Sequence, residues 1–141
     1  MSTCTFFGHK DCTDSISEKL YKEIESLILN NDVTKFYVGN QGNFDALAYK
    51  LLVKLRVKYP NIKIYRVLAY MPKSGEVIPD SIIPEGIELV YPRYAILWRN
   101  KWMIDNSDYA IAYVTSNIGV AFKFASMAEE KGKNVRNIFN H

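Results

Sequence analysis

One short stretch is most informative about the fold: Lys35-Phe36-Tyr37-Val38-Gly39-Asn40-Gln41-Gly42. An apolar run that stops at closely spaced glycines is typical of a buried strand followed by a tight turn. A helix is predicted directly after it, because apolar residues recur at steps of three and four. These residues are Phe44, Leu47, Leu51, Leu52 and Leu55. The unit is therefore a strand, a glycine-containing turn and a helix.

The same unit recurs along the chain. Residues 3–7 form an apolar strand that stops at Gly8, and Asp14-Ser15 then starts a helix with apolar positions at Ile16, Leu20, Ile24, Leu27 and Ile28. Further strands are predicted at residues 62–70, 87–90, 109–115 and 134–139, and further helices at residues 93–105 and 120–131. The prolines and glycines of residues 71–86 predict a long surface loop.

This alternation of strands and helices predicts the fold class. Right-handed crossovers between parallel strands place helices on both faces of a mostly parallel sheet, which gives a Rossmann-like α/β three-layer sandwich. A length of 141 residues suits a single domain, residues 1–141. Ligands of such sheets bind beyond the carboxyl ends of the strands, so the strand-to-helix loops are the expected site.

Composition excludes several classes of protein. With 48% hydrophobic and 23% charged residues, the chain is too apolar to be disordered. No apolar run is long enough to span a membrane, and the N-terminus lacks the basic stretch of a signal peptide, so we expect a cytoplasmic protein with no membrane partner. Two cysteines and two histidines provide neither a disulfide framework nor a zinc site, and we expect no metal and no cofactor. A net charge of +3 makes nucleic acid an unexpected partner.

Two of the loops carry groups that suit an anion. Gly8, His9 and Lys10 combine a flexible backbone, a histidine and a cation just before a helix, and Thr115, Ser116 and Gly119 precede another helix start. Backbone amides at helix N-termini attract phosphate. The alternative is that Gly8 and Gly119 permit turns, His9 makes a local hydrogen bond and Ser116 caps a helix.

A third loop suits a ribose. Gly39 and Gly42 allow close backbone approach, while Asn40 and Asp45 are short polar groups that can bind hydroxyls. The spacing matches neither a dinucleotide fingerprint nor a P-loop. An Asp in a first helical turn is also favourable to the helix dipole without any ligand, so this alternative stays open.

The helix at residues 93–105 adds a guanidinium, Arg99, flanked by Trp98 and Trp102. Arg99 is assigned to phosphate and Tyr70 to stacking against a base. The two tryptophans are either core residues or part of a homodimer interface, and we predict a homodimer.

Four segments together resemble a group of small Firmicute proteins in the SLOG superfamily of Rossmann-like nucleotide-binding domains. They are Thr5-Phe6-Phe7-Gly8-His9-Lys10-Asp11-Cys12, Phe36-Tyr37-Val38-Gly39-Asn40-Gln41-Gly42-Asn43-Phe44-Asp45, Leu68-Ala69-Tyr70-Met71-Pro72 and Arg99-Asn100-Lys101-Trp102-Met103. The superfamily includes the Lonely Guy phosphoribohydrolases, DNA-processing protein A and sensor domains for ADP-ribose-like nucleotides. The phosphoribohydrolases carry Pro-Gly-Gly-x-Gly-Thr-x-x-Glu. Aligned on Gly119, this chain has Val120 in place of the Thr and Lys123 in place of the Glu.

The resemblance implies binding of a nucleotide-like small molecule, either ADP-ribose-like or a nucleoside monophosphate. Because Lys123 removes the carboxylate that supports glycosidic cleavage, the leading hypothesis is binding without turnover. An N-glycosidase with Asp45 as its catalytic carboxylate is the alternative. A third hypothesis is a protein-interaction or single-strand-binding module, for which oligonucleotide binding would depend steeply on salt.

Overall fold

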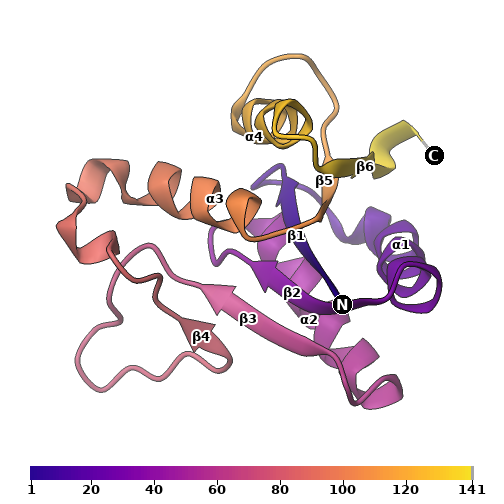
Figure 1. Ribbon diagram of the computed structural model, residues 1–141, viewed down its shortest axis with the longest axis horizontal. Coiled ribbons are helices and arrows are strands. Elements are labelled where there is room, and N and C mark those ends of the chain that lie inside the picture. The colour runs from indigo at the N-terminus through magenta and orange to yellow at the C-terminus, as the bar shows by residue number, and fades with distance from the viewer. Residues whose placement is uncertain (141) are drawn as a thin grey trace.

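The computed structural model describes residues 1–140 and shows one sheet of six parallel strands (Figure 1). The strands are β1 (Ser2–Gly8), β2 (Val33–Val38), β3 (Lys63–Val67), β4 (Ser81–Ile82), β5 (Tyr109–Tyr113) and β6 (Asn134–Asn137). Their spatial order is β4-β3-β2-β1-β5-β6, and every neighbouring pair is parallel. The predicted α/β Rossmann-like class is confirmed.

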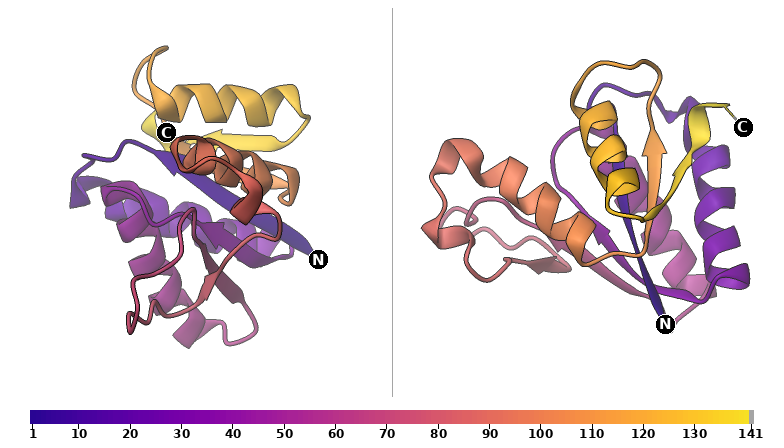
Figure 2. Two further views of the ribbon diagram at one scale, coloured as in Figure 1. Left: turned by 90° about the vertical axis from the view of Figure 1, so that its left-hand side faces the viewer. Right: turned by 45° about the horizontal axis from the view of Figure 1, so that its top comes forward.

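Four α-helices cover the sheet, namely α1 (Ser17–Asn30), α2 (Asn43–Lys58), α3 (Ala95–Asp105) and α4 (Val120–Glu130). Alternate residues of β1 explain the layers, because Cys4 and Phe6 pack with the apolar faces of α1 and α2, whereas Phe7 packs with α3 and α4. Figure 2 shows these two helical layers from two further directions. The central strand is therefore buried on both sides, as its uninterrupted apolar sequence requires.

Two predicted elements were wrong. Residues 87–90 do not form a strand, because Ile87–Leu89 is a 3-10 helix that starts after Gly86 in a left-handed conformation and buries Ile87 against Ala69 and Ala95. The fourth strand is instead the two-residue β4, inside the segment predicted to be a loop. Smaller differences are at strand ends: β3 stops at Val67, and β6 stops at Asn137, where a 3-10 helix follows.

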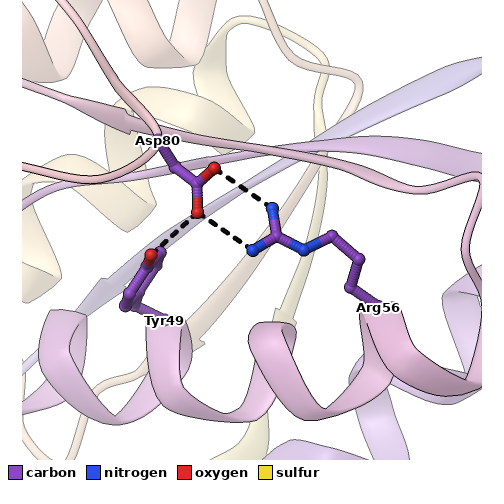
Figure 3. Close-up of polar contacts among 3 residues, drawn as sticks. All are labelled: Tyr49, Arg56 and Asp80. Atoms are coloured by element: carbon purple, nitrogen blue, oxygen red, sulfur yellow. Dashed lines mark hydrogen bonds and ion pairs between the residues drawn. The ribbon is translucent and has the colours of Figure 1, made fainter.

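A cluster of polar side chains holds β4 at the edge of the sheet. Asp80 accepts hydrogen bonds from Tyr49 Oη at 2.7 Å and from both terminal nitrogens of Arg56 at 3.1 Å (Figure 3). The carbonyl of Asp80 also accepts from the backbone N–H of Arg66, whose guanidinium lies 4.2 Å from the ring centroid of Tyr49. Asp80 has a φ of 61°, a left-handed conformation that Asp tolerates better than most residues. The edge strand is thus fixed by tertiary contacts to α2 rather than by its own length.

Within residues 1–140, none of the helices combines the length and the apolar character needed to pass through a lipid bilayer.

Candidate functional site

The site lies at the point in the sheet where the order of the strands reverses, between β1 and β5. From β1 the chain builds outward through β2 to one edge, while β5 and β6 lie on the other side of β1. The loops after β1 and β5 therefore diverge, and in open parallel sheets this divergence leaves a crevice for ligands. A pocket of about 450 Å³ opens here, on the face of the sheet covered by α3 and α4. It is lined by Phe6, Phe7, Gly8, His9, Lys10, Asp11, Gln41, Asp45, Ile96, Arg99, Asn100, Met103, Val120, Ala121 and Phe124.

The lining divides into an apolar part and a polar part. Aromatic and aliphatic side chains come from β1, α3 and α4. Charged or amide side chains come from the loops after β1 and β2, from the first turn of α2 and from the middle of α3. Volume and mixed lining match those of ordinary small-molecule pockets, in which apolar walls supply affinity and a few polar groups fix orientation.

Arg99 is the most informative polar residue of the pocket. Only 2% of its surface is exposed, although it is a cation. Its Nη1 donates to the carbonyl of Val67 at 2.9 Å and to Asn40 Oδ1 at 3.3 Å, and its Nε donates to Asn100 Oδ1 at 2.8 Å. Among the described residues, no carboxylate lies within ion-pair distance of it. Burial lowers the pKa of Arg99, and the charge of Asp45 opposes that shift.

Asp45 lies half-buried in the first turn of α2. One carboxylate oxygen, Oδ2, accepts a hydrogen bond from the backbone N–H of Gln41 at 3.0 Å. Burial raises the pKa of Asp45 from 3.8 to about 6, against the opposing effects of the Gln41 N–H and the Arg99 charge. A pocket carboxyl whose pKa is raised by burial is typical of functional sites.

Gly39 separates these two charged side chains. A Cβ atom at this position would stand 2.6 Å from Asp45 Oδ2 and 3.2 Å from Arg99 Cζ. Any side chain here would therefore displace the carboxylate or the guanidinium. The glycine is explained by this close approach.

The first two loops are joined directly. The backbone N–H of Asn43 donates to the carbonyl of Lys10 at 2.6 Å, and Gly42, with a φ of 89°, brings its backbone against Lys10 where a Cβ would stand 2.5 Å from Lys10 Cβ. On the other side, His9 Nε2 lies 2.9 Å from Thr115 Oγ1 and accepts from the Thr115 backbone N–H at 3.2 Å. His9 thus ties the loop after β1 to the loop after β5.

Among the predicted site residues, five line the pocket together: Gly8, His9, Lys10, Asp45 and Arg99. Gly39 and Gly42 lie next to it and shape it through the contacts above. Asn40 is exposed and does not line the pocket; its Oδ1 accepts hydrogen bonds from two residues that do, Arg99 Nη1 at 3.3 Å and Gln41 Nε2 at 3.4 Å. Gly119 precedes the pocket-lining Val120 at the start of α4.

The other predicted residues lie outside this pocket. Tyr70 donates its hydroxyl to the carbonyl of Pro92 at 2.9 Å, which holds its ring against the segment before α3. Thr115 and Ser116 line a smaller pocket of about 200 Å³ between α4 and β6. The tryptophans have partners within the monomer, since Trp102 packs edge-on against Tyr37 at 5.0 Å and Trp98 packs beside Ile87 and Ala95.

Sequence reasoning missed Asn100, which is 6% exposed and lines the pocket beside Arg99. An asparagine in the middle of an apolar helix is unfavourable for helix formation, and this signal singles out the position. Within the described part of the chain, no group of three or more His, Cys, Asp or Glu side chains is arranged to hold a metal ion.

The starts of two helices also face this region. Gly42 and Gly119 are the N-cap residues of α2 and α4, and neither helix has a side-chain hydrogen bond capping its first turn. Apart from the N–H of Asn43, which donates to the carbonyl of Lys10, backbone N–H groups in such first turns can bind other acceptors.

These features define the class of protein as a Rossmann-like α/β domain with a pocket at the switch point of a parallel sheet. No known family model and no curated protein sequence matches the chain. Among solved structures, DNA processing protein A (DprA) from Streptococcus pneumoniae is similar, with a TM-score of 0.66, 16% sequence identity, and coverage of 96% of this chain and 49% of that protein. The chain thus spans about half the length of its structural relative. The expected likeness to DNA-processing protein A is confirmed at the level of the fold.

Proposed function

We propose that this domain binds a nucleotide or nucleotide-derived ligand in the pocket between α3 and α4. The observation that carries the proposal is Arg99, a cation that is 98% buried without an ion-pair partner among the described residues. An uncompensated buried charge lowers the stability of a fold, so its presence in a pocket favours a role in binding an anion.

The rest of the pocket suits the remaining parts of a nucleotide. Phe124, Met103 and Ile96 offer an apolar surface for a base, and Lys10 adds a second cation at the rim. Asp45 is a hydrogen-bond acceptor suited to ribose hydroxyls. Asn40 was expected to contact the ribose directly. In this proposal it instead positions the guanidinium of Arg99 by accepting its hydrogen bond.

Thermal unfolding in the presence of AMP, ADP-ribose and cyclic AMP tests the proposal. A ligand at 100 times its dissociation constant adds about 2.7 kcal/mol of stability and raises the melting temperature. Lys10→Gln should reduce that rise because Lys10 lines the pocket, whereas Lys19→Gln, an exposed position on α1, should not. No stabilisation by any of the three nucleotides would contradict the proposal.

The raised pKa of Asp45 favours an N-glycosidase acting on nucleoside monophosphates as a second candidate. Incubation with nucleoside monophosphates and chromatography for free base separates the candidates. Turnover that disappears in Asp45→Asn, with binding retained, would establish catalysis. Binding without any released base would exclude the N-glycosidase and support the first proposal, nucleotide binding without turnover.

A further inference from the structure

Two buried side chains of α3 have hydrogen-bond donors without a protein acceptor. Arg99 has five N–H donors, and its hydrogen bonds to the described residues use Nε and Nη1. Nη2 donates to no atom of the described residues, and neither does Asn100 Nδ2. Both residues are more than nine-tenths buried, and both line the pocket.

The orientation of the Asn100 amide is fixed by its neighbour. Arg99 Nε can only donate, so the atom of Asn100 that it meets at 2.8 Å must be the amide oxygen. The NH2 group of Asn100 consequently takes the other position. Nη2 lies beside Nε on the edge of the guanidinium that faces Asn100, so the free donors of the two side chains are neighbours.

Both free donors remain open to the pocket. The buried polar atoms that lack both a partner and solvent contact are Thr5 Oγ1, Arg66 Nε and Ser107 Oγ, and neither Arg99 Nη2 nor Asn100 Nδ2 is among them. Since the two residues line the pocket, the solvent that reaches these nitrogens is the solvent of the pocket. A ligand that displaces this solvent must supply acceptor atoms in its place, because buried donors without partners are costly.

We infer that Arg99 and Asn100 together form an oxyanion subsite in the interior of the pocket, and that it binds the phosphate group of the ligand. This inference rests on the proposed function and makes it more specific. A guanidinium edge next to an amide NH2 presents several donors to one group, and a phosphate has enough oxygens to accept from both. From the sequence, phosphate is expected at the loop amides near Gly8 and Gly119, together with Lys10 and Arg99. Asn100 is not among the residues assigned to it there.

The arrangement also gives Asn100 two separable roles. Its oxygen holds Arg99, and its nitrogen contacts the ligand. Asn100→Asp keeps an acceptor for Arg99 Nε and replaces the NH2 group by a carboxylate oxygen. This variant therefore retains the positioning role and removes the donor.

The test uses the side-chain NH2 signals of the ¹⁵N-labelled full chain during titrations with AMP, adenosine and inorganic phosphate. The Asn100 signals are those missing in Asn100→Asp. They should shift with AMP and with phosphate and stay in place with adenosine, which lacks the oxyanion. The NH2 signals of Asn106 should not move with any of the three, because that group donates to the carbonyl of Trp102.

Calorimetry with AMP gives the second readout. Asn100→Asp should weaken AMP binding by about tenfold or more. Asn106→Asp, which adds the same charge at the exposed end of α3, should leave it within about twofold. If Asn100→Asp does not fold, the Asn100 NH2 signals are assigned by triple-resonance experiments on the wild type, and the wild-type titration then carries the test.

The outcomes separate the two proposals. If AMP shifts the backbone amides of Gly8 and Lys10 while the Asn100 NH2 signals stay in place, the subsite is refuted and the proposed function stands. If neither phosphate nor any of AMP, ADP-ribose and cyclic AMP shifts a signal of the pocket residues, both are refuted. Shifts of Asn100 with AMP and phosphate, absent with adenosine, support the subsite.

Discussion

Replacing Asp45 by Asn should remove a pH dependence from the stability of the fold. In the wild type, burial raises the pKa of this carboxyl from 3.8 to about 6. The folded state therefore binds more protons than the unfolded state between these two values, and the free energy of unfolding falls as the pH rises through this window. Above it the group is ionised in both states and the loss is constant.

The size of the effect follows from the displacement of the pKa. At 1.36 kcal/mol for each pH unit, the difference between 3.8 and about 6 corresponds to about 3 kcal/mol. An amide at position 45 is uncharged and its oxygen can still accept from the Gln41 N–H. We therefore expect Asp45→Asn to match the wild type at about pH 4 and to exceed it by up to about 3 kcal/mol at about pH 7.

Urea unfolding of both proteins across this pH range measures the difference. Asp105→Asn is the control, because Asp105 is an exposed partner of Lys131 and its loss should change stability by less than about 1 kcal/mol. A difference between Asp45→Asn and the wild type that is the same at both ends of the range would refute the reasoning.

Three further predictions concern packing, the edge strand and assembly. Gly39→Ala should lower stability by about 1–3 kcal/mol in urea unfolding, because its Cβ would stand 2.6 Å from Asp45 Oδ2. The cost should shrink in Gly39→Ala/Asp45→Ala, and simple additivity of the two changes would contradict this contact. Asp80→Asn should cost about 1 kcal/mol at neutral pH, since hydrogen bonds from Arg56 lower the pKa of Asp80, and this cost should vanish as the pH falls through that lowered value. A homodimer remains our prediction for assembly, and light scattering that finds only a 16.2 kDa species at micromolar concentration would exclude it.

The helices and the central strands could be predicted because their pattern is local. In α1 and α2, apolar residues recur at every third or fourth position because one face of each helix is buried. In β1 the apolar run is continuous because both faces of the strand are buried. The two-residue β4 could not be predicted, because it depends on Asp80 meeting Tyr49 and Arg56 of α2. The apolar residues at 87–90 suggested a strand, but Ile87 is buried by contacts with Ala69 and Ala95.

The candidate site was predicted in its location more than in its details. The rule that ligands lie at the carboxyl ends of parallel strands selected Lys10 and Asp45, and Arg99 was selected for its guanidinium beside two tryptophans. All three line the pocket. The burial of Arg99 and the free amide of Asn100 depend on how α3 packs against the sheet, which no sequence spacing expresses. For the same reason Tyr70, which follows β3 closely, was not expected to bond Pro92.

The order of the elements along the chain has a consequence for synthesis on the ribosome. By the time residue 94 has emerged, β1 to β4 can pair, and α1 and α2 can cover one face of this four-stranded part of the sheet. The opposite face, with Phe7, Tyr37 and Val67, has no cover until α3 and α4 follow. A nascent chain paused at this stage would present a bare apolar surface, which is the kind of surface that chaperones bind and that aggregates in their absence.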